Sequence, residues 1–176
     1  MNGDGTSSPL PEVTIYTDGA CNPNPGPGGW AAVMLFTDRD MQELVGNELD
    51  TTNNRMEMCA AIEALAALPG PRRIDLYTDS EYLRRGITEW LPAWVRQNWK
   101  TSRRANVKNQ DLWRELARQI ARHEIAWNWI KGHAGSYWNW YADQLAGQAL
   151  TEARKIRRTS RRPRAQVRQQ GPGSRI

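Results

Sequence analysis

The 176-residue sequence lacks the features of several large protein classes. Its two cysteines, Cys21 and Cys59, are too few for a disulfide framework, and no Cys/His cluster has the spacing of a zinc site. No apolar run approaches the roughly 18 residues that span a bilayer, and the first residues lack a signal-peptide pattern. These absences exclude a disulfide-rich secreted protein, a membrane protein and a wholly disordered chain. We expect a soluble, cytoplasmic protein with no membrane partner.

Acidic residues are missing from the C-terminal end. Nine of the 24 basic residues lie at or after Arg154, whereas all 19 acidic residues precede it. The first 153 residues therefore hold 15 basic and 19 acidic side chains, a net charge of −4, although the whole chain carries +5. We predict a flexible leader at 1–11, one domain at 12–153 and a disordered basic tail at 154–176. The tail either keeps the protein soluble or attracts phosphate groups.

Apolar periodicity predicts a mixed α/β domain. Strands are expected at 13–17, 30–36, 41–49, 73–78 and 125–130. Helices are expected at 55–68, 81–86, 91–98, 111–122 and 141–153. The segment 22–29 is rich in Pro, Gly and Asn and is predicted to be a loop, and Asn53 or Asn54 is expected to cap the first helix. The strand–helix–strand order around that helix favours parallel pairing of strands 13–17 and 73–78.

Two aspartates follow these two strands in matching contexts. Asp18 comes after Tyr16-Thr17, and Asp79 comes after Tyr77-Thr78. If the strands are parallel neighbours, both carboxylates emerge at the same edge, where α/β sheets place their sites. The alternative is that each aspartate simply ends a strand.

Two further acids lie on the predicted helices. Glu57 shares a helix face with small apolar residues, which suits either an exposed helix end or a ligand reaching over a strand edge. Asp143 lies near the start of the last helix, where it could merely favour the helix dipole. Several acids that converge without basic partners repel one another unless a hard cation such as Mg²⁺ or Mn²⁺ neutralises them.

A set of short segments, in order along the chain, resembles the ribonuclease H type 1 family over about residues 12–153. The segments are Tyr16–Cys21, Asn24–Trp30, Thr51–Glu57, Thr78–Ser80, Trp99–Thr101, Val107–Asn109, Asp111–Trp113 and Lys131–Gly135. The resemblance implies a five-stranded mixed sheet of order 3-2-1-4-5 flanked by helices. It also implies an endonuclease that hydrolyses the RNA strand of RNA–DNA hybrids and leaves 5′-phosphate and 3′-hydroxyl ends.

The catalytic residues implied by the resemblance are four acids and one histidine. Asp18, Glu57, Asp79 and Asp143 fall on the metal-binding acids, which would hold two Mg²⁺ ions, with Mn²⁺ as a possible substitute. His133 falls on a loop histidine associated with proton transfer or product release. From the residues alone, a histidine between glycines is more often an ordinary loop residue than a catalytic one.

The resemblance also implies which residues contact the hybrid. The positions near the minor groove are matched by Cys21, Asn24, Asn53 and Asn54. The positions near a DNA-strand phosphate are matched by Thr52, Arg55 and Asn109. Short polar side chains suit recognition of the RNA 2′-hydroxyl, although asparagines also form turns and caps. The implied partner is an RNA–DNA hybrid, bound by a monomer without an obligate protein partner.

Residues 84–110 match the basic protrusion, or handle, of cellular members of the family. The expected phosphate contacts are Arg96, Lys100, Arg103, Arg104 and Lys108. Trp90 is the best candidate among the tryptophans to contact a base or sugar, although tryptophans between short helices more often form core.

The chain departs from the family pattern in three places. Pro23 stands where Gly is usual, and Glu81 stands where Gln is common. Within residues 136–141, where the family has small and polar residues, Asn139 is kept but four residues are aromatic. The aromatic residues either add packing or alter the catalytic loop. Two other functions stay open at this stage: a module that holds hybrids without cutting them, and a metal nuclease of the same fold that acts on DNA.

Overall fold

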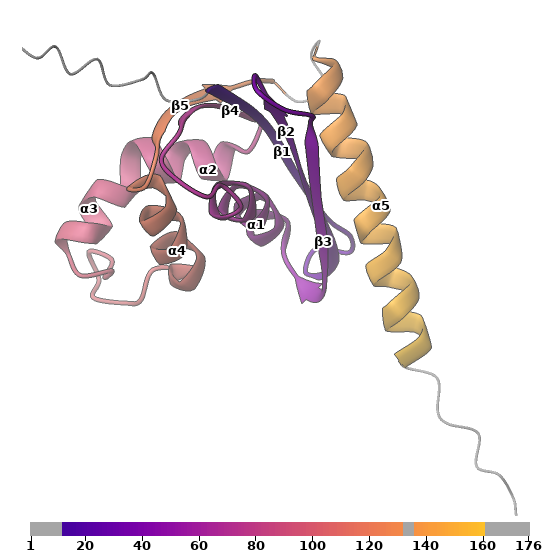
Figure 1. The fold of residues 1–176 in the computed structure, drawn as a ribbon. Helices are drawn as coiled ribbons and strands as arrows, with labels where there is room; N and C mark the ends of the chain where they lie inside the picture. Colours follow the sequence, from indigo (N-terminus) through magenta and orange to yellow (C-terminus); the bar gives the residue numbers. More distant parts are fainter. Residues whose placement is uncertain (1–11, 132–135, 161–176) are drawn as a thin grey trace, which may run out of the picture.

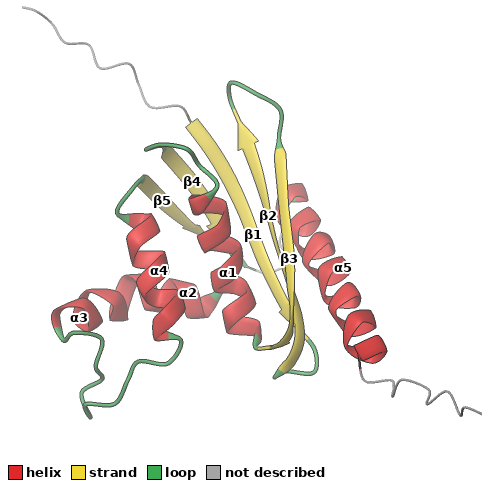
Figure 2. Ribbon diagram, turned by 60° about the horizontal axis from the view of Figure 1, so that its bottom comes forward, coloured by secondary structure: helices red, strands yellow, loops and turns green. Residues whose placement is uncertain are grey.

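A mixed five-stranded sheet organises the computed structural model, which describes residues 12–131 and 136–160. The strand order is β3-β2-β1-β4-β5 (Figures 1 and 2), as the family resemblance implied. β1 pairs antiparallel with β2 and parallel with β4, while β2–β3 is antiparallel and β4–β5 is parallel. The strands are β1 (Glu12–Cys21), β2 (Gly26–Phe36), β3 (Gln42–Thr51), β4 (Arg73–Thr78) and β5 (Glu124–Trp129).

Helices cover both faces of the sheet. Figures 1 and 2 show α5 alone against one face, and α1 with the other helices on the opposite side. The helical elements are α1 (Asn53–Ala66), α2 (Glu81–Arg85), a π-helical turn η1 (Gly86–Trp90), α3 (Leu91–Arg96), α4 (Gln110–Ile120) and α5 (Tyr137–Ser160). Within the described ranges, no helix has the length and apolar character needed to cross a membrane.

The main core lies between the sheet and α1. Ile15 of β1, Met34 of β2 and Leu76 of β4 are fully buried there against Leu65 of α1. Trp113 of α4 is also fully buried and extends the core towards the handle. Burial of these side chains fixes the sheet register against α1, and α1 carries one of the candidate site acids.

Three local predictions were wrong. Residues 26–29 begin β2 instead of belonging to a loop. Helix α1 is capped by Thr52 and not by Asn53 or Asn54. Thr52 Oγ1 accepts a hydrogen bond from the Arg55 backbone N–H at 3.4 Å. Helix α5 begins at Tyr137 and continues to Ser160. Residues 154–160 therefore form its last turns and not the start of a disordered tail.

Candidate active site

The carboxylates of Asp18, Glu57 and Asp79 converge at the end of the central strands. Each offers an oxygen that lies within 4.8 Å of the others. The parallel register pairs Tyr16 with Tyr77. Two residues later, Asp18 lies within β1 and Asp79 directly follows the end of β4. Their side chains leave the same edge of the sheet, as the matching sequence contexts predicted.

Glu57 reaches this edge because α1 lies very close to β1. A Cβ added to Gly19 would lie 2.3 Å from the Glu57 backbone nitrogen, so only glycine permits this approach. The Glu57 side chain is only 5% exposed, which excludes the exposed helix end considered above. A backbone N–H at Gly19 and the side chain of Asn53 provide hydrogen bonds to its carboxylate.

Burial and mutual repulsion raise the pKa values of two of the acids. Burial, followed by repulsion from Asp79 and Asp143, raises the pKa of Asp18 from 3.8 to about 7. Burial also raises the pKa of Glu57 well above its usual value, with Asp18 and Asp79 adding to the effect. Asp143 shares a side-chain hydrogen bond with Asp18. Asp143, the fourth predicted acid, belongs to α5 and therefore lies beside the cluster.

The donor set fits a hard divalent cation. Glu57 Oε2 is buried and has no hydrogen-bond partner among the described residues, which is costly unless something else satisfies it. All the ligand atoms in the cluster are carboxylate oxygens, the type that Mg²⁺ and Mn²⁺ prefer. A cation at this place would satisfy the free oxygen and remove the mutual repulsion.

The family model for RNase H matches residues 11–151. The chain belongs to the RNase H family. A Ribonuclease H of Bradyrhizobium diazoefficiens is 52% identical over 153 residues, which cover 87% of this chain and 99% of the relative. A Ribonuclease HI of Pseudomonas aeruginosa is 55% identical and covers 80% of this chain and 95% of its own length. The solved structure of LC9-RNase H1, a type 1 RNase H with the type 2 active-site motif, has 30% identity and a TM-score of 0.74, covering 84% of this chain and 76% of that one.

These relationships make this RNase H a nuclease that hydrolyses RNA in RNA–DNA hybrids. RNase H enzymes depend on divalent metal ions, and the acid cluster is the place in the described chain where such ions fit. His133, the fifth predicted catalytic residue, lies outside the described residues.

Several of the predicted minor-groove residues meet beside the acids. Asn24 Oδ1 accepts a hydrogen bond from the Asn53 backbone N–H at 3.3 Å. Cys21 Sγ lies 3.3 Å from the Pro23 carbonyl oxygen and 3.5 Å from that of Thr51. The turn after β1 and the start of α1 are thus joined, and Asn54 follows Asn53 on the same helical turn.

The predicted phosphate-grip residues also converge, but with a partner that sequence reasoning missed. Arg55 binds Asp111 through two hydrogen bonds of 3.1 and 2.8 Å, and its Nη1 lies 3.5 Å from Asn109 Oδ1. Asn109 has a left-handed backbone, with φ of 56°, at the N-terminus of α4. Arg55 is thus already neutralised by Asp111, while Thr52 contacts the same turn as the helix cap.

The handle combines an aromatic interior with an exposed basic rim. Trp90 packs against Tyr82 and Trp94, with ring centroids 5.9 and 5.5 Å apart, and Arg85 lies over its ring. The five predicted phosphate contacts all have exposed side chains: Arg96, Lys100, Arg103, Arg104 and Lys108. Lys100 Nζ donates to Asn106 Oδ1 at 2.6 Å, which closes the handle loop.

Two of the unusual positions have structural partners. Glu81 forms an ion pair with Arg84 one turn later. The aromatic residues form the first turn of α5, where the rings of Tyr137 and Tyr141 stack at 6.0 Å and the Tyr141 hydroxyl donates to Glu43 at 2.7 Å. Sequence reasoning also missed the part of Asn53 in orienting Glu57. The spacing of the two residues, one helical turn, was its only signal.

Proposed function

We propose that this RNase H cuts the RNA strand endonucleolytically and leaves 5′-phosphate and 3′-hydroxyl ends. The observation that supports this most directly is the cluster of Asp18, Glu57 and Asp79, with Asp143 beside it and a buried oxygen of Glu57 left free. We further propose that the four acids hold two Mg²⁺ ions, which Mn²⁺ can replace. When bound, such ions activate the attacking water and stabilise charge on the leaving 3′ oxygen.

The protein's own residues would position the hybrid. Cys21, Asn24, Asn53 and Asn54 lie at the edge next to Glu57, where they can meet the sugar 2′-hydroxyls that distinguish RNA from DNA. Thr52, Arg55 and Asn109 would hold a DNA-strand phosphate. The handle cations and Trp90 would contact the duplex away from the scissile phosphate. His133 would assist proton transfer or product release. In this proposal the enzyme works as a cytoplasmic monomer.

A strand-specific cleavage assay tests the proposal. The parent chain is incubated with an RNA–DNA hybrid labelled on the RNA, with duplex DNA and with single-stranded RNA, each in Mg²⁺, Mn²⁺ and EDTA. We expect cutting of the hybrid RNA alone, dependent on a divalent ion. The products should be extended by a polymerase without prior phosphatase treatment, because they end in a 3′-hydroxyl.

Asp18→Asn is the matched variant, because it removes one charge and almost preserves shape. We expect it to bind the hybrid without cutting it. Hybrid binding without cutting by the parent would identify a binding module instead. Preferential cutting of duplex DNA would identify a DNA nuclease of the same fold.

A further inference from the structure

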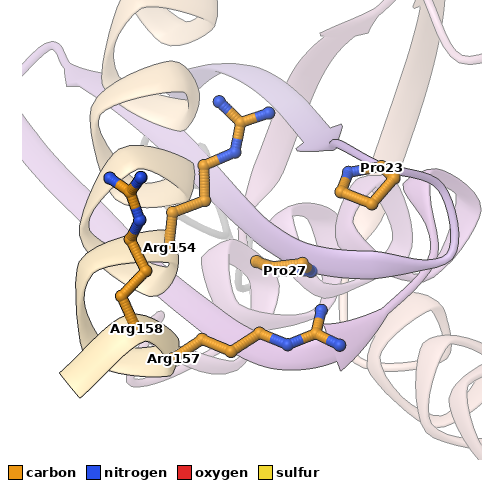
Figure 3. Close-up of a pocket in the computed structure, with 5 residues that line it drawn as sticks. All are labelled: Pro23, Pro27, Arg154, Arg157 and Arg158. Carbon is orange, nitrogen blue, oxygen red and sulfur yellow. The ribbon is translucent and has the colours of Figure 1, made fainter. Parts of the chain in front are cut away.

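A cavity of about 520 Å³ lies away from the acid cluster, between the C-terminal part of α5 and the turn that joins β1 to β2. Figure 3 shows its lining: Pro23 from the turn, Pro27 from the start of β2, and Arg154, Arg157 and Arg158 from the helix. The arginines stand three and four residues apart, so they share one face of α5. The cavity therefore has an apolar proline wall and a wall of guanidinium groups.

One of these arginines is held by a hydrogen bond, and none of the three is neutralised by an acid among the described residues. Arg154 Nε donates to the Asn22 carbonyl oxygen at 3.0 Å, which ties the helix to the turn. Among the described residues, no carboxylate forms an ion pair with Arg154, Arg157 or Arg158. Their neighbour Lys155, by contrast, pairs with Glu152 at 3.3 Å. Three guanidinium groups on one part of the helix without paired acids repel one another, and an anion between them would relieve that repulsion.

The chemistry of the lining favours a phosphodiester. Guanidinium groups donate paired hydrogen bonds that match phosphate oxygens, and arginine is common wherever phosphate groups are recognised. The lining holds three arginines and no acid, and such a cluster of positive charge suits the repeated phosphates of a polyanion.

The position of the cavity points to a nucleic acid backbone. The turn that carries Pro23 also carries Asn24, which is joined through Asn53 to the site acids. Along α5, the arginines lie 11–15 residues after Asp143, or roughly 17–23 Å at 1.5 Å per residue. One strand of a duplex advances about 3.4 Å per nucleotide, so this distance corresponds to about five to seven nucleotides.

We propose that Arg154, Arg157 and Arg158, together with the turn at 22–27, form a second phosphate-binding site that holds the substrate backbone about five to seven nucleotides from the scissile phosphate. This inference rests on the proposed function for the identity of the substrate. It assigns a role to the last turns of α5, which lie beyond the residues that match the family model.

Binding measurements on the full chain test the site. The variants carry Asp18→Asn to prevent cutting, and fluorescence anisotropy gives the Kd at several salt concentrations. The test variant is Arg157→Gln/Arg158→Gln. The control, Arg118→Gln/Lys155→Gln, removes the same charge from side chains already paired with Glu115 and Glu152. Each is measured on a hybrid of about 24 base pairs and on one of about 4, which spans roughly 14 Å at 3.4 Å per nucleotide and is too short to reach from the acids to the arginines.

We expect the test variant to bind the long hybrid about 5- to 30-fold more weakly at low salt, and to lower the slope of log Kd against log salt by about 1–2. The short hybrid should bind as it does to the parent. Arg157→Lys/Arg158→Lys should keep most of the slope, because it keeps the charge. A test variant that behaves like the control on the long hybrid, or that loses the short hybrid equally, would overturn the site. Hybrid cleavage by the parent without Asp18→Asn reports separately on the proposed function.

Discussion

At the scale of single residues, the acidic cluster is held together at an energetic cost. Asp18 has a pKa of about 7 in the folded chain, raised by burial and then by Asp79 and Asp143, against an ordinary value of 3.8. Below about pH 4 the folded and unfolded chains both hold this proton, so the cost is absent. As pH rises towards 7, the unfolded chain releases the proton first, and the folded chain loses stability relative to it.

Replacing Asp18 with Asn should therefore separate activity from stability. The variant should lose cleavage, yet in EDTA at pH 7 it should be as stable as the parent or more stable by about 1–3 kcal/mol, because one pKa unit corresponds to about 1.4 kcal/mol. Mg²⁺ should raise the melting temperature of the parent more than that of the variant, because it binds only the folded form. Thermal melts of both proteins with EDTA and with Mg²⁺ measure this. A lower melting temperature in EDTA would mean that Asp18 is a structural hydrogen-bond partner.

The pH dependence of unfolding gives an independent test of the same cluster. In EDTA, the free energy of unfolding of the parent should fall relative to that of Asp18→Asn between about pH 4 and pH 7, and the difference should level off above pH 7. Glu57 contributes in the same direction, because its pKa is also raised. Urea unfolding of both proteins at several pH values measures the difference. Parallel curves across this range would contradict the raised pKa of Asp18.

At the scale of elements, the site depends on how closely α1 and α5 approach the sheet. Because Gly19 has no side chain, α1 can pack closely on β1, and Gly29 allows α5 to pack closely on β2 in the same way. A Cβ on Gly29 would lie 2.2 Å from the Leu150 backbone nitrogen and 2.5 Å from the Ala146 carbonyl oxygen. Since backbone atoms cannot turn away as a side chain can, any larger residue must push α5 off β2. Asp143 lies on the same helix and would move with it.

Gly29→Ala should therefore damage both stability and the site. We expect a loss of about 1–3 kcal/mol or more from overpacking, together with a smaller rise in melting temperature on adding Mg²⁺. Gly147→Ala is the matched control on α5, because an added Cβ there meets nothing within 4 Å. It should be neutral or stabilise the helix by roughly 0.5–1 kcal/mol. Equal melting temperatures for Gly29→Ala and the parent would show that α5 can shift without cost.

The same elements show what the sequence could and could not predict. β4 was predicted at its observed bounds, Arg73–Thr78, because a short alternating run stands between clear breakers. The start of β2 was missed because Gly26–Gly29 has loop composition, and its pairing with both β1 and β3 overrides that preference. Helix α5 was predicted to end at 153 because residues 154–160 contain few apolar side chains. It continues to Ser160 because Arg and Lys are good helix formers even when they are exposed.

Some features of the candidate site were likewise predictable from the sequence, and others were not. The convergence of Asp18 and Asp79 was predictable, since element order favours parallel pairing and both residues follow a Tyr-Thr pair. The burial of Glu57 and its free oxygen depends on the distance between α1 and β1, which no local pattern encodes. The pairing of Arg55 with Asp111 joins residues 56 positions apart and was equally hidden.

At the scale of the whole molecule, charge is divided along the chain. The first 153 residues carry −4 and the remainder supplies all of the excess positive charge. A polyanionic substrate must therefore approach a mildly acidic body, on which the exposed cations of the handle form one favourable region. The C-terminal cations offer a second region, and they fall into two groups: four at 154–158, within α5, and five at 161–176.

Two truncations separate the contributions of these groups. A chain ending at Ser160 keeps the arginines that line the cavity, whereas a chain ending at Ala153 also loses the contact between Arg154 and Asn22. If both groups attract the substrate, KM for a long hybrid at moderate salt should rise at each truncation, and the salt slope of binding should fall at each. The turnover number should change little, because the acids are untouched. Steady-state kinetics at several salt concentrations gives both quantities. If the chain ending at Ser160 has the same KM and salt slope as the full chain, residues 161–176 do not attract the substrate. A lower turnover number in the chain ending at Ala153 would mean that the last turns of α5 help to fix Asp143.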